Sequence, residues 1–68
     1  MNKEMIRTEL AAISDQITAI ANEAIAKKLR FVYDMKNDSL FTLPVSNCGR
    51  DIQALQRRSS ALIDDLYA

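Results

Sequence analysis

Apolar side chains recur at alternating four- and three-residue spacings through the first third of the chain. The repeat consists of Ile6, Leu10, Ile13, Ile17, Ile20 and Ala24. This is the a/d spacing of a coiled-coil seam, and it predicts an amphipathic helix that needs a partner surface. After Ile20 the apolar stripe drifts sideways, as the 3.6-residue period of a straight helix requires. We therefore expect coiled-coil packing early in this helix and ordinary amphipathic packing later.

A second apolar repeat near the C-terminal end predicts a second helix, at about residues 49–66. It has the same three- and four-residue spacing, with Ile52, Leu55, Leu62 and Leu66 as its apolar members and Ser59 as the one polar interruption. Asn47 stands just before it and is the expected N-cap. Two amphipathic helices with a short connection are predicted to fold back on each other as an antiparallel hairpin.

The segment between the two repeats permits two structures. The spacing of its apolar residues continues the first helix to about residue 35, which leaves a connection at about 37–48, where Pro44 blocks a regular helix. The alternative is a β-hairpin within residues 30–46. In that case the β-favouring run Phe31–Tyr33 pairs with Leu40–Val45 across the turn cluster at 36–39. We take the helix, at about 3–35, as the first expectation and keep the α–β-hairpin–α arrangement as the alternative.

The size of the chain indicates how such helices would be stabilised. Sixty-eight residues make a single domain, 1–68, and bury only a small core. Cys48 is the only cysteine, so no intramolecular disulfide is possible. Association is the remaining means of stabilisation, and it predicts an all-α fold in which two-helix hairpins assemble into a helical-bundle oligomer. A homodimer is the default, and larger oligomers remain open.

Charge is balanced overall but unevenly distributed. Residues 1–26 carry two basic and four acidic side chains, residues 27–58 carry seven basic and three acidic ones, and residues 59–68 carry two acidic ones. The basic middle of the chain is the best candidate for binding an anion or a charged partner. Its candidate residues are Lys27, Lys28, Arg30, Arg50, Arg57 and Arg58.

The residue types present argue against most catalytic chemistry. The chain has no histidine, which is the commonest general base and zinc ligand, and it has no glycine-rich phosphate loop. Cys48 therefore lacks the usual base of a cysteine nucleophile. We expect no catalytic residues, no metal site and no cofactor. No apolar run reaches the length of a membrane span and no apolar signal core is present, so a cytoplasmic location is expected.

These observations favour a small non-enzymatic, oligomeric protein-binding module that acts as an adaptor, inhibitor or regulator. Composition of this kind is common among small proteins of phages and mobile elements. The expected partners are further copies of the chain and another protein, and the alternative function is binding of a nucleic acid or anionic nucleotide through the basic middle. The expected interface residues are apolar: Ile6, Leu10, Ile13, Ile17, Ile20, Phe31, Tyr33, Leu40, Phe41 and Leu43.

Overall fold

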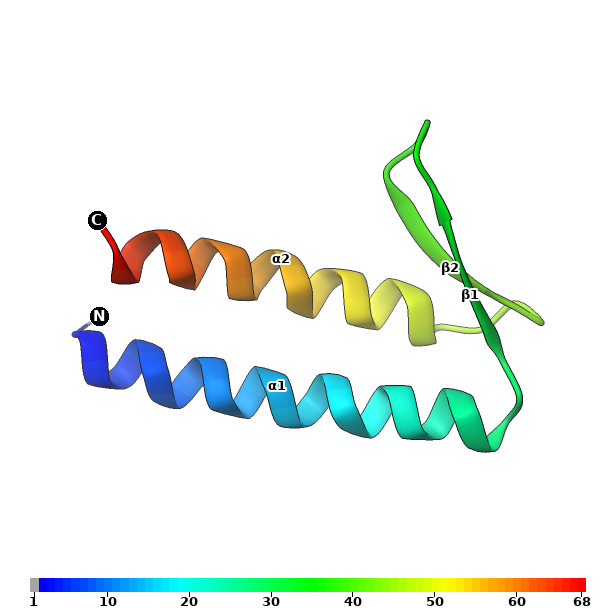
Figure 1. Cartoon of the computed structure of the whole chain (residues 1–68), viewed down its shortest axis with the longest axis horizontal. Coiled ribbons are helices and arrows are strands. Elements are labelled where there is room, and N and C mark those ends of the chain that lie inside the picture. The colour runs from blue at the N-terminus through cyan, green and yellow to red at the C-terminus, as the bar shows by residue number, and fades with distance from the viewer. Residues whose placement is uncertain (1) are drawn as a thin grey trace.

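Two antiparallel helices are joined by a β-hairpin that projects from one end of the helical pair (Figure 1). The computed structural model describes residues 2–68. In chain order the elements are α1 (Lys3–Ala26), β1 (Arg30–Asp34), β2 (Ser39–Leu43) and α2 (Cys48–Leu66). The predicted all-α fold is therefore wrong, because the middle of the chain forms a two-stranded antiparallel sheet. The alternative α–β-hairpin–α arrangement fits the structure.

Helix α1 begins where the sequence predicts but ends well before residue 35. The Asn2 side chain accepts a hydrogen bond from the backbone N–H of Met5 at 2.8 Å and caps the first turn. At the other end, Lys28 N–H bonds to Ile25 C=O and Leu29 N–H bonds to Ala24 C=O. This is the Schellman pattern, which requires a left-handed residue after the cap. Lys28 takes that conformation with φ 58°, so the helix ends without the glycine that usually occupies this position.

The hairpin is closed by a turn whose backbone is held by an aspartate. The strands pair in register from Arg30 opposite Leu43 to Asp34 opposite Ser39. The Asp34 carboxylate accepts hydrogen bonds from the backbone N–H groups of Lys36 and Asn37 and from the Asn37 side chain. Such side-chain bonds to the backbone two and three residues ahead favour a turn over a continuing helix.

The regular apolar repeat of α1 packs against α2 of the same chain. Ile6 and Ile13 are almost completely buried and form the core with Leu62. Half-buried side chains that surround this core come from both helices and are Leu10, Ile17, Leu55 and Leu66. The predicted coiled coil is not supported, because the seam serves as the inner stripe of one short helical pair within an α+β fold. In residues 2–68 neither helix has the length and apolar character needed to cross a membrane.

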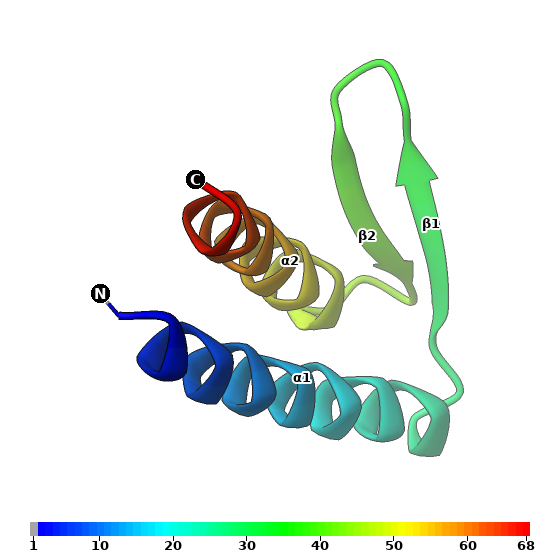
Figure 2. The same ribbon diagram turned by 60° about the vertical axis from the view of Figure 1, so that its left-hand side comes forward.

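The hairpin is attached to α2 along one strand only. Figure 2 shows β2 lying between α2 and β1, and the extensive contacts of the sheet with the helices are those between β2 and α2. Gly49 in the first turn of α2 is buried directly beneath β2. A methyl group at this position would lie 2.7 Å from Phe41 Cα and 2.8 Å from the Leu40 carbonyl oxygen. The absence of a side chain at Gly49 is therefore what lets the strand backbone lie against the helix.

Candidate interaction surface

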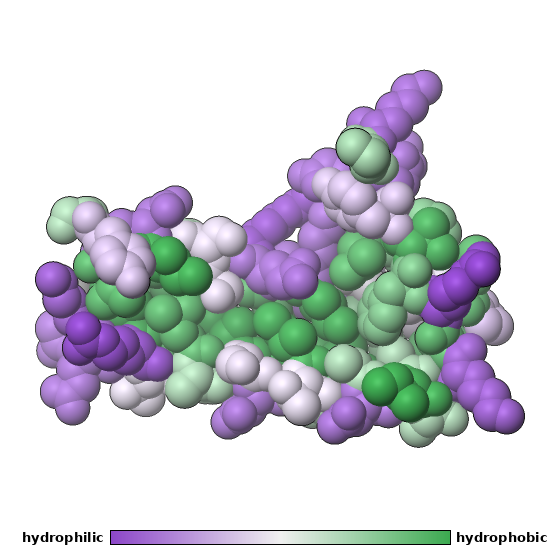
Figure 3. All heavy atoms as spheres, viewed as in Figure 1, coloured by the Kyte–Doolittle hydropathy of each residue, from purple (hydrophilic) through white to green (hydrophobic). Residues whose placement is uncertain are grey.

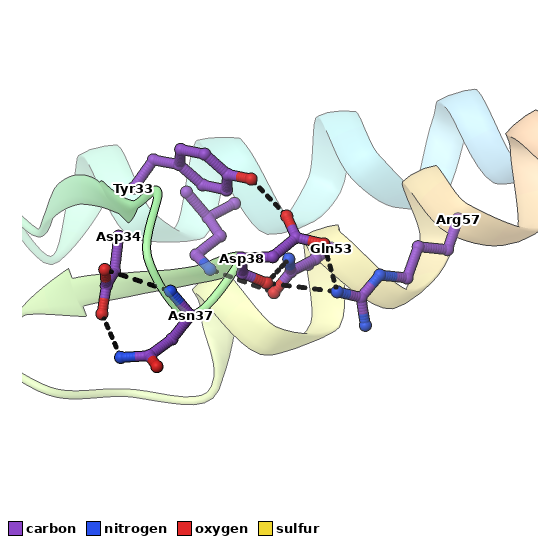
Figure 4. A network of polar contacts seen from close by, with 7 residues as sticks. Tyr33, Asp34, Asn37, Asp38, Gln53 and Arg57 are labelled. Carbon is purple, nitrogen blue, oxygen red and sulfur yellow. Dashed lines mark hydrogen bonds and ion pairs between the residues drawn. The ribbon is translucent and has the colours of Figure 1, made fainter.

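A network of polar side chains fastens the tip of the hairpin to the outer side of α2 (Figure 4). Asp38 is at its centre, in a left-handed backbone conformation with φ 49°. Its carboxylate accepts a hydrogen bond from the Tyr33 hydroxyl and forms an ion pair with Arg57, at an N–O distance of 3.2 Å. Gln53 donates to the Asp38 carbonyl at 2.6 Å and accepts from the Leu40 N–H at 3.0 Å. Side chains of β1 and α2 thus meet at this aspartate of the turn, and Gln53 links it to β2.

The same contacts shift the ionisation of two groups. The hydrogen bond from Tyr33 lowers the pKa of Asp38 below its ordinary value of 3.8, and the charge of Arg57 contributes in the same direction. Asp38 in turn raises the pKa of Tyr33 above its ordinary value of 10.0. The ionised aspartate and neutral tyrosine are therefore the partners that hold the hairpin tip across the whole neutral range.

A shallow cleft of about 500 Å³ opens beside this network, between the hairpin tip and α2. It is lined mainly by polar and charged side chains: Tyr33, Asp38, Gln53, Gln56, Arg57, Ser60, Ala61 and Asp64. A second hollow of about 420 Å³ lies on the N-terminal half of α1, around Met5 and Ala12. Both are open at the surface, and neither encloses a buried reactive group.

A second polar cluster closes the base of the hairpin. Thr42 is fully buried, and its hydroxyl donates to the Pro44 carbonyl at 3.0 Å. Each hydroxyl has one proton, so the 2.6 Å contact between the two hydroxyls is a bond from Ser46 to Thr42. Ser46 also accepts from the Cys48 N–H at 3.2 Å. Asn47 occupies the N-cap position of α2, as predicted, and its carbonyl accepts from the Asp51 N–H at 2.9 Å. Its side chain makes no capping bond, so Ser46, one residue earlier, supplies the side-chain acceptor at the start of the helix.

Cys48 carries a buried free thiol at the start of α2, and this thiol faces the C-terminal end of α1. Its Sγ lies 3.7 Å from a Glu23 carboxylate oxygen, and the other oxygen of Glu23 pairs with Lys27 at 3.0 Å. Lys27 lowers the pKa of Glu23 and Glu23 raises that of Lys27, chiefly through their hydrogen bond. The thiol therefore faces a carboxylate that is kept ionised.

The predicted basic residues do not form one cluster. Arg57 pairs with Asp38 in the hairpin, and Arg58, the next residue, pairs with Glu9 of α1. Arg50 lies near its neighbour Asp51, and Lys27 forms an ion pair with Glu23. Lys28 and Arg30 take part in no ion pair within residues 2–68. The structure thus assigns Arg57 and Arg58 to joining elements of the fold, and anion binding at any of the six residues stays a prediction.

The predicted apolar interface residues divide into buried and uncovered sets. Ile6 and Ile13 are 1% and 3% exposed, which leaves no surface for a partner, whereas Leu10, Ile17 and Ile20 are half-buried. In the sheet, Leu40 and Phe41 are half-buried, and the uncovered side chains are Phe31, Tyr33 and Leu43. The other large apolar residues that lie exposed are Met5, Ile25, Met35, Val45, Ile63 and Tyr67. Figure 3 shows a continuous apolar band along the helical pair on the face turned toward the viewer.

Three features of this surface were missed by reasoning from the sequence. They are the central role of Asp38, its link to Gln53, and the close approach at Gly49. An Asn-Asp pair between two apolar runs is the available signal for the turn. Nothing local connects that turn to a glutamine 15 residues later.

Comparison with known proteins adds no assignment to this description. No protein-family model matches the chain, and neither a curated protein nor a solved structure matches it. In residues 2–68 no three His, Cys, Asp or Glu side chains gather in a group that could hold a metal ion.

Proposed function

We propose that this chain is a small non-enzymatic module that associates with copies of itself and binds another protein in the cytoplasm, as an adaptor, inhibitor or regulator. The observation that carries the proposal is the amount of apolar surface left uncovered. The described residues form a thin layer, with Cα extents of 40 × 28 × 12 Å, in which only the hairpin packs against the helical pair.

The distribution of apolar side chains supports an interaction role. Among residues 2–68, six apolar residues are buried and nine large ones are exposed, including Ile63 and Met5 on the two helices. A soluble monomer seldom leaves a continuous apolar surface of this kind open, and such surfaces commonly mark protein-binding sites. The small core provides a second argument, because association is one of the means by which chains of this size make up for a small core.

The mass in solution tests the first half of the proposal. Light scattering over a range of micromolar concentrations is expected to give a mass above that of one chain, which is 7.7 kDa. A single-chain mass at every concentration contradicts self-association.

Binding of another protein needs a test that depends on the apolar surface. Ile63→Ser removes an exposed apolar side chain from α2, and Ala54→Ser is a matched control at an exposed alanine of the same helix. The proposal expects a partner that is captured from the native host, binds again when purified, and binds less tightly to Ile63→Ser than to the control. Equal binding to both variants, or no reconstituted complex, contradicts it.

A further inference from the structure

The outer edge of β1 offers unpaired backbone groups to a further strand. Leu40 in β2 sends its N–H to Gln53 of α2, so this group points away from β1. Residues opposite each other in an antiparallel pair alternate between hydrogen-bonded and non-hydrogen-bonded positions. Leu40 faces Tyr33 and Thr42 faces Phe31, so Tyr33 and Phe31 are both at non-hydrogen-bonded positions. Their backbone N–H and C=O groups therefore point outward, away from β2.

No other element of the described chain covers this edge. In residues 2–68 the sheet has two strands, and the extensive contacts of β1 are those with β2. Within residues 2–68, no hydrogen bond beyond the hairpin's own ladder uses a backbone group of Phe31 or Tyr33. The side chains beside the edge are apolar and open: Phe31 is 37% exposed, Tyr33 52% and Met35 85%. An edge of this kind is a template for pairing with another strand.

The sequence of β1 is complementary to itself in the antiparallel direction. It reads Arg-Phe-Val-Tyr-Asp from 30 to 34. When two copies pair about a two-fold axis at Val32, Arg30 of each lies opposite Asp34 of the other. Each Phe31 then lies opposite Tyr33 of the second copy. Opposite charges and aromatic pairs across strands are both stabilising.

The hydrogen-bonding pattern agrees with this register. The outward-pointing groups belong to Phe31 and Tyr33, and these two residues face each other across the axis, so each pair can exchange two backbone hydrogen bonds. A register shifted by one residue would set the outward-pointing backbone groups of one copy opposite residues of the second copy whose backbone groups point inward, toward their own β2. A shift by two residues leaves part of β1 opposite residues outside the strand, and in one direction sets Arg30 against Lys36.

The Asp34 carboxylate accepts three hydrogen bonds within its own turn and would bind Arg30 of the second copy through its remaining lone pairs. Neither Arg30 nor Asp34 takes part in an ion pair among the described residues. Arg30 and Asp34 of the second copy occupy a non-hydrogen-bonded position of the new ladder, where side chains lie closest. We propose that two copies of this chain pair through the outer edges of β1, centred on Val32, to form a four-stranded antiparallel sheet. This inference rests on the self-association in the proposed function and names its contact.

Charge reversal at Arg30 tests the register. Arg30→Glu sets two like-charged pairs in place of two opposite-charged ones, and the dissociation constant of the dimer is expected to rise about tenfold or more at low salt. The increase should shrink as salt screens the charges. Lys36→Glu is the matched control: it makes the same change of charge at an exposed turn residue outside the strand. The dissociation constant of the Lys36→Glu dimer should stay within about twofold of the wild-type value. This is far less than the tenfold change that corresponds to about 1.4 kcal/mol.

Two readouts on the whole chain decide the outcome. Sedimentation equilibrium gives the dissociation constants, and circular dichroism checks that each variant is folded. Isotope-filtered NMR on mixed labelled and unlabelled chains should detect contacts between Phe31 of one copy and Tyr33 of the other. A wild-type chain that stays monomeric overturns both this inference and the proposed self-association. A wild-type dimer that Arg30→Glu does not weaken, without Phe31–Tyr33 contacts between copies, overturns the β1 pairing alone.

Discussion

Replacing Gly49 with alanine is expected to separate the hairpin from α2. The new methyl group would meet three backbone atoms of β2 at 2.7, 2.8 and 2.9 Å, which are shorter than any normal contact of a Cβ atom. Backbone atoms cannot rotate away as a side chain can, so the strand itself must move. Gln53 lies one helical turn further along α2, and its hydrogen bonds to Leu40 and Asp38 would be strained by that movement.

The magnitude follows from three contributions. Overpacking in a tight site typically costs about 1–3 kcal/mol. Weakening the two hydrogen bonds of Gln53 adds about 1 kcal/mol. The higher helix propensity of alanine stabilises the helix and offsets at most about 1 kcal/mol of this loss. The net loss is about 1–4 kcal/mol, a large part of the roughly 3–5 kcal/mol that the core of so small a domain supplies.

Urea unfolding followed by circular dichroism measures this loss as a lower midpoint. If the hairpin detaches before the helices unfold, the slope of the transition should also fall, because less surface is then exposed on unfolding. Arg50→Ala is the matched control, since Arg50 is the exposed neighbour of Gly49 in the same helical turn. It should change stability by no more than about 0.5 kcal/mol. A Gly49→Ala variant as stable as the wild type, at the same protein concentration, would refute the close approach of β2 to α2.

Three further predictions follow from the hairpin contacts and the core. Asp38 has a lowered pKa and Tyr33 a raised one, so their contribution to stability should be lost as pH falls below 3.8 toward the pKa of Asp38, and again as pH rises above 10.0 through that of Tyr33. In Asp38→Asn, urea midpoints should depend less on pH at both ends, and an unchanged profile would contradict the network. Thr42→Val keeps the shape of the side chain but leaves the Ser46 hydroxyl without its acceptor, so it should cost about 1–3 kcal/mol in urea unfolding; a neutral result would count against the buried hydroxyl chain. Ile13→Ala should cost about 2–5 kcal/mol in the same assay, whereas Ala12→Ser at its exposed neighbour should cost far less.

The two helices could be recognised from the sequence because their signals are local. The apolar repeat of α1 and the shorter repeat of α2 both place one stripe on one face, and the structure uses these stripes as the shared core around Ile13 and Leu62. The association suggested by the same repeat remains a prediction. What the spacing could not distinguish is whether such a seam meets another chain or the second helix of its own chain.

Helix α1 ends at Ala26, before the predicted end at about residue 35, for a physical reason. A Schellman end normally shows itself by a glycine in the left-handed position, and here Lys28 takes that position. The residues that follow have helical spacing and β-favouring side chains at the same time, so local preference leaves the two structures close in free energy. The contact of β2 with Gly49 and the bonds from Gln53 exist only in the hairpin, and they lower its free energy relative to a continued helix.

Local patterns along the chain thus indicate two amphipathic helices, a turn-forming segment near Asp38, and a core too small to account for all the apolar residues. The packing of the folded chain selects a β-hairpin at residues 30–43, with strands at 30–34 and 39–43. It also joins α2 to the hairpin through Arg57 and to α1 through Arg58, and it leaves the outer edge of β1 open. The reason is the range of the interactions. Periodicity and capping act within a few residues, whereas the contacts that select the hairpin join residues up to 19 positions apart, and Arg58 pairs with a glutamate 49 positions away.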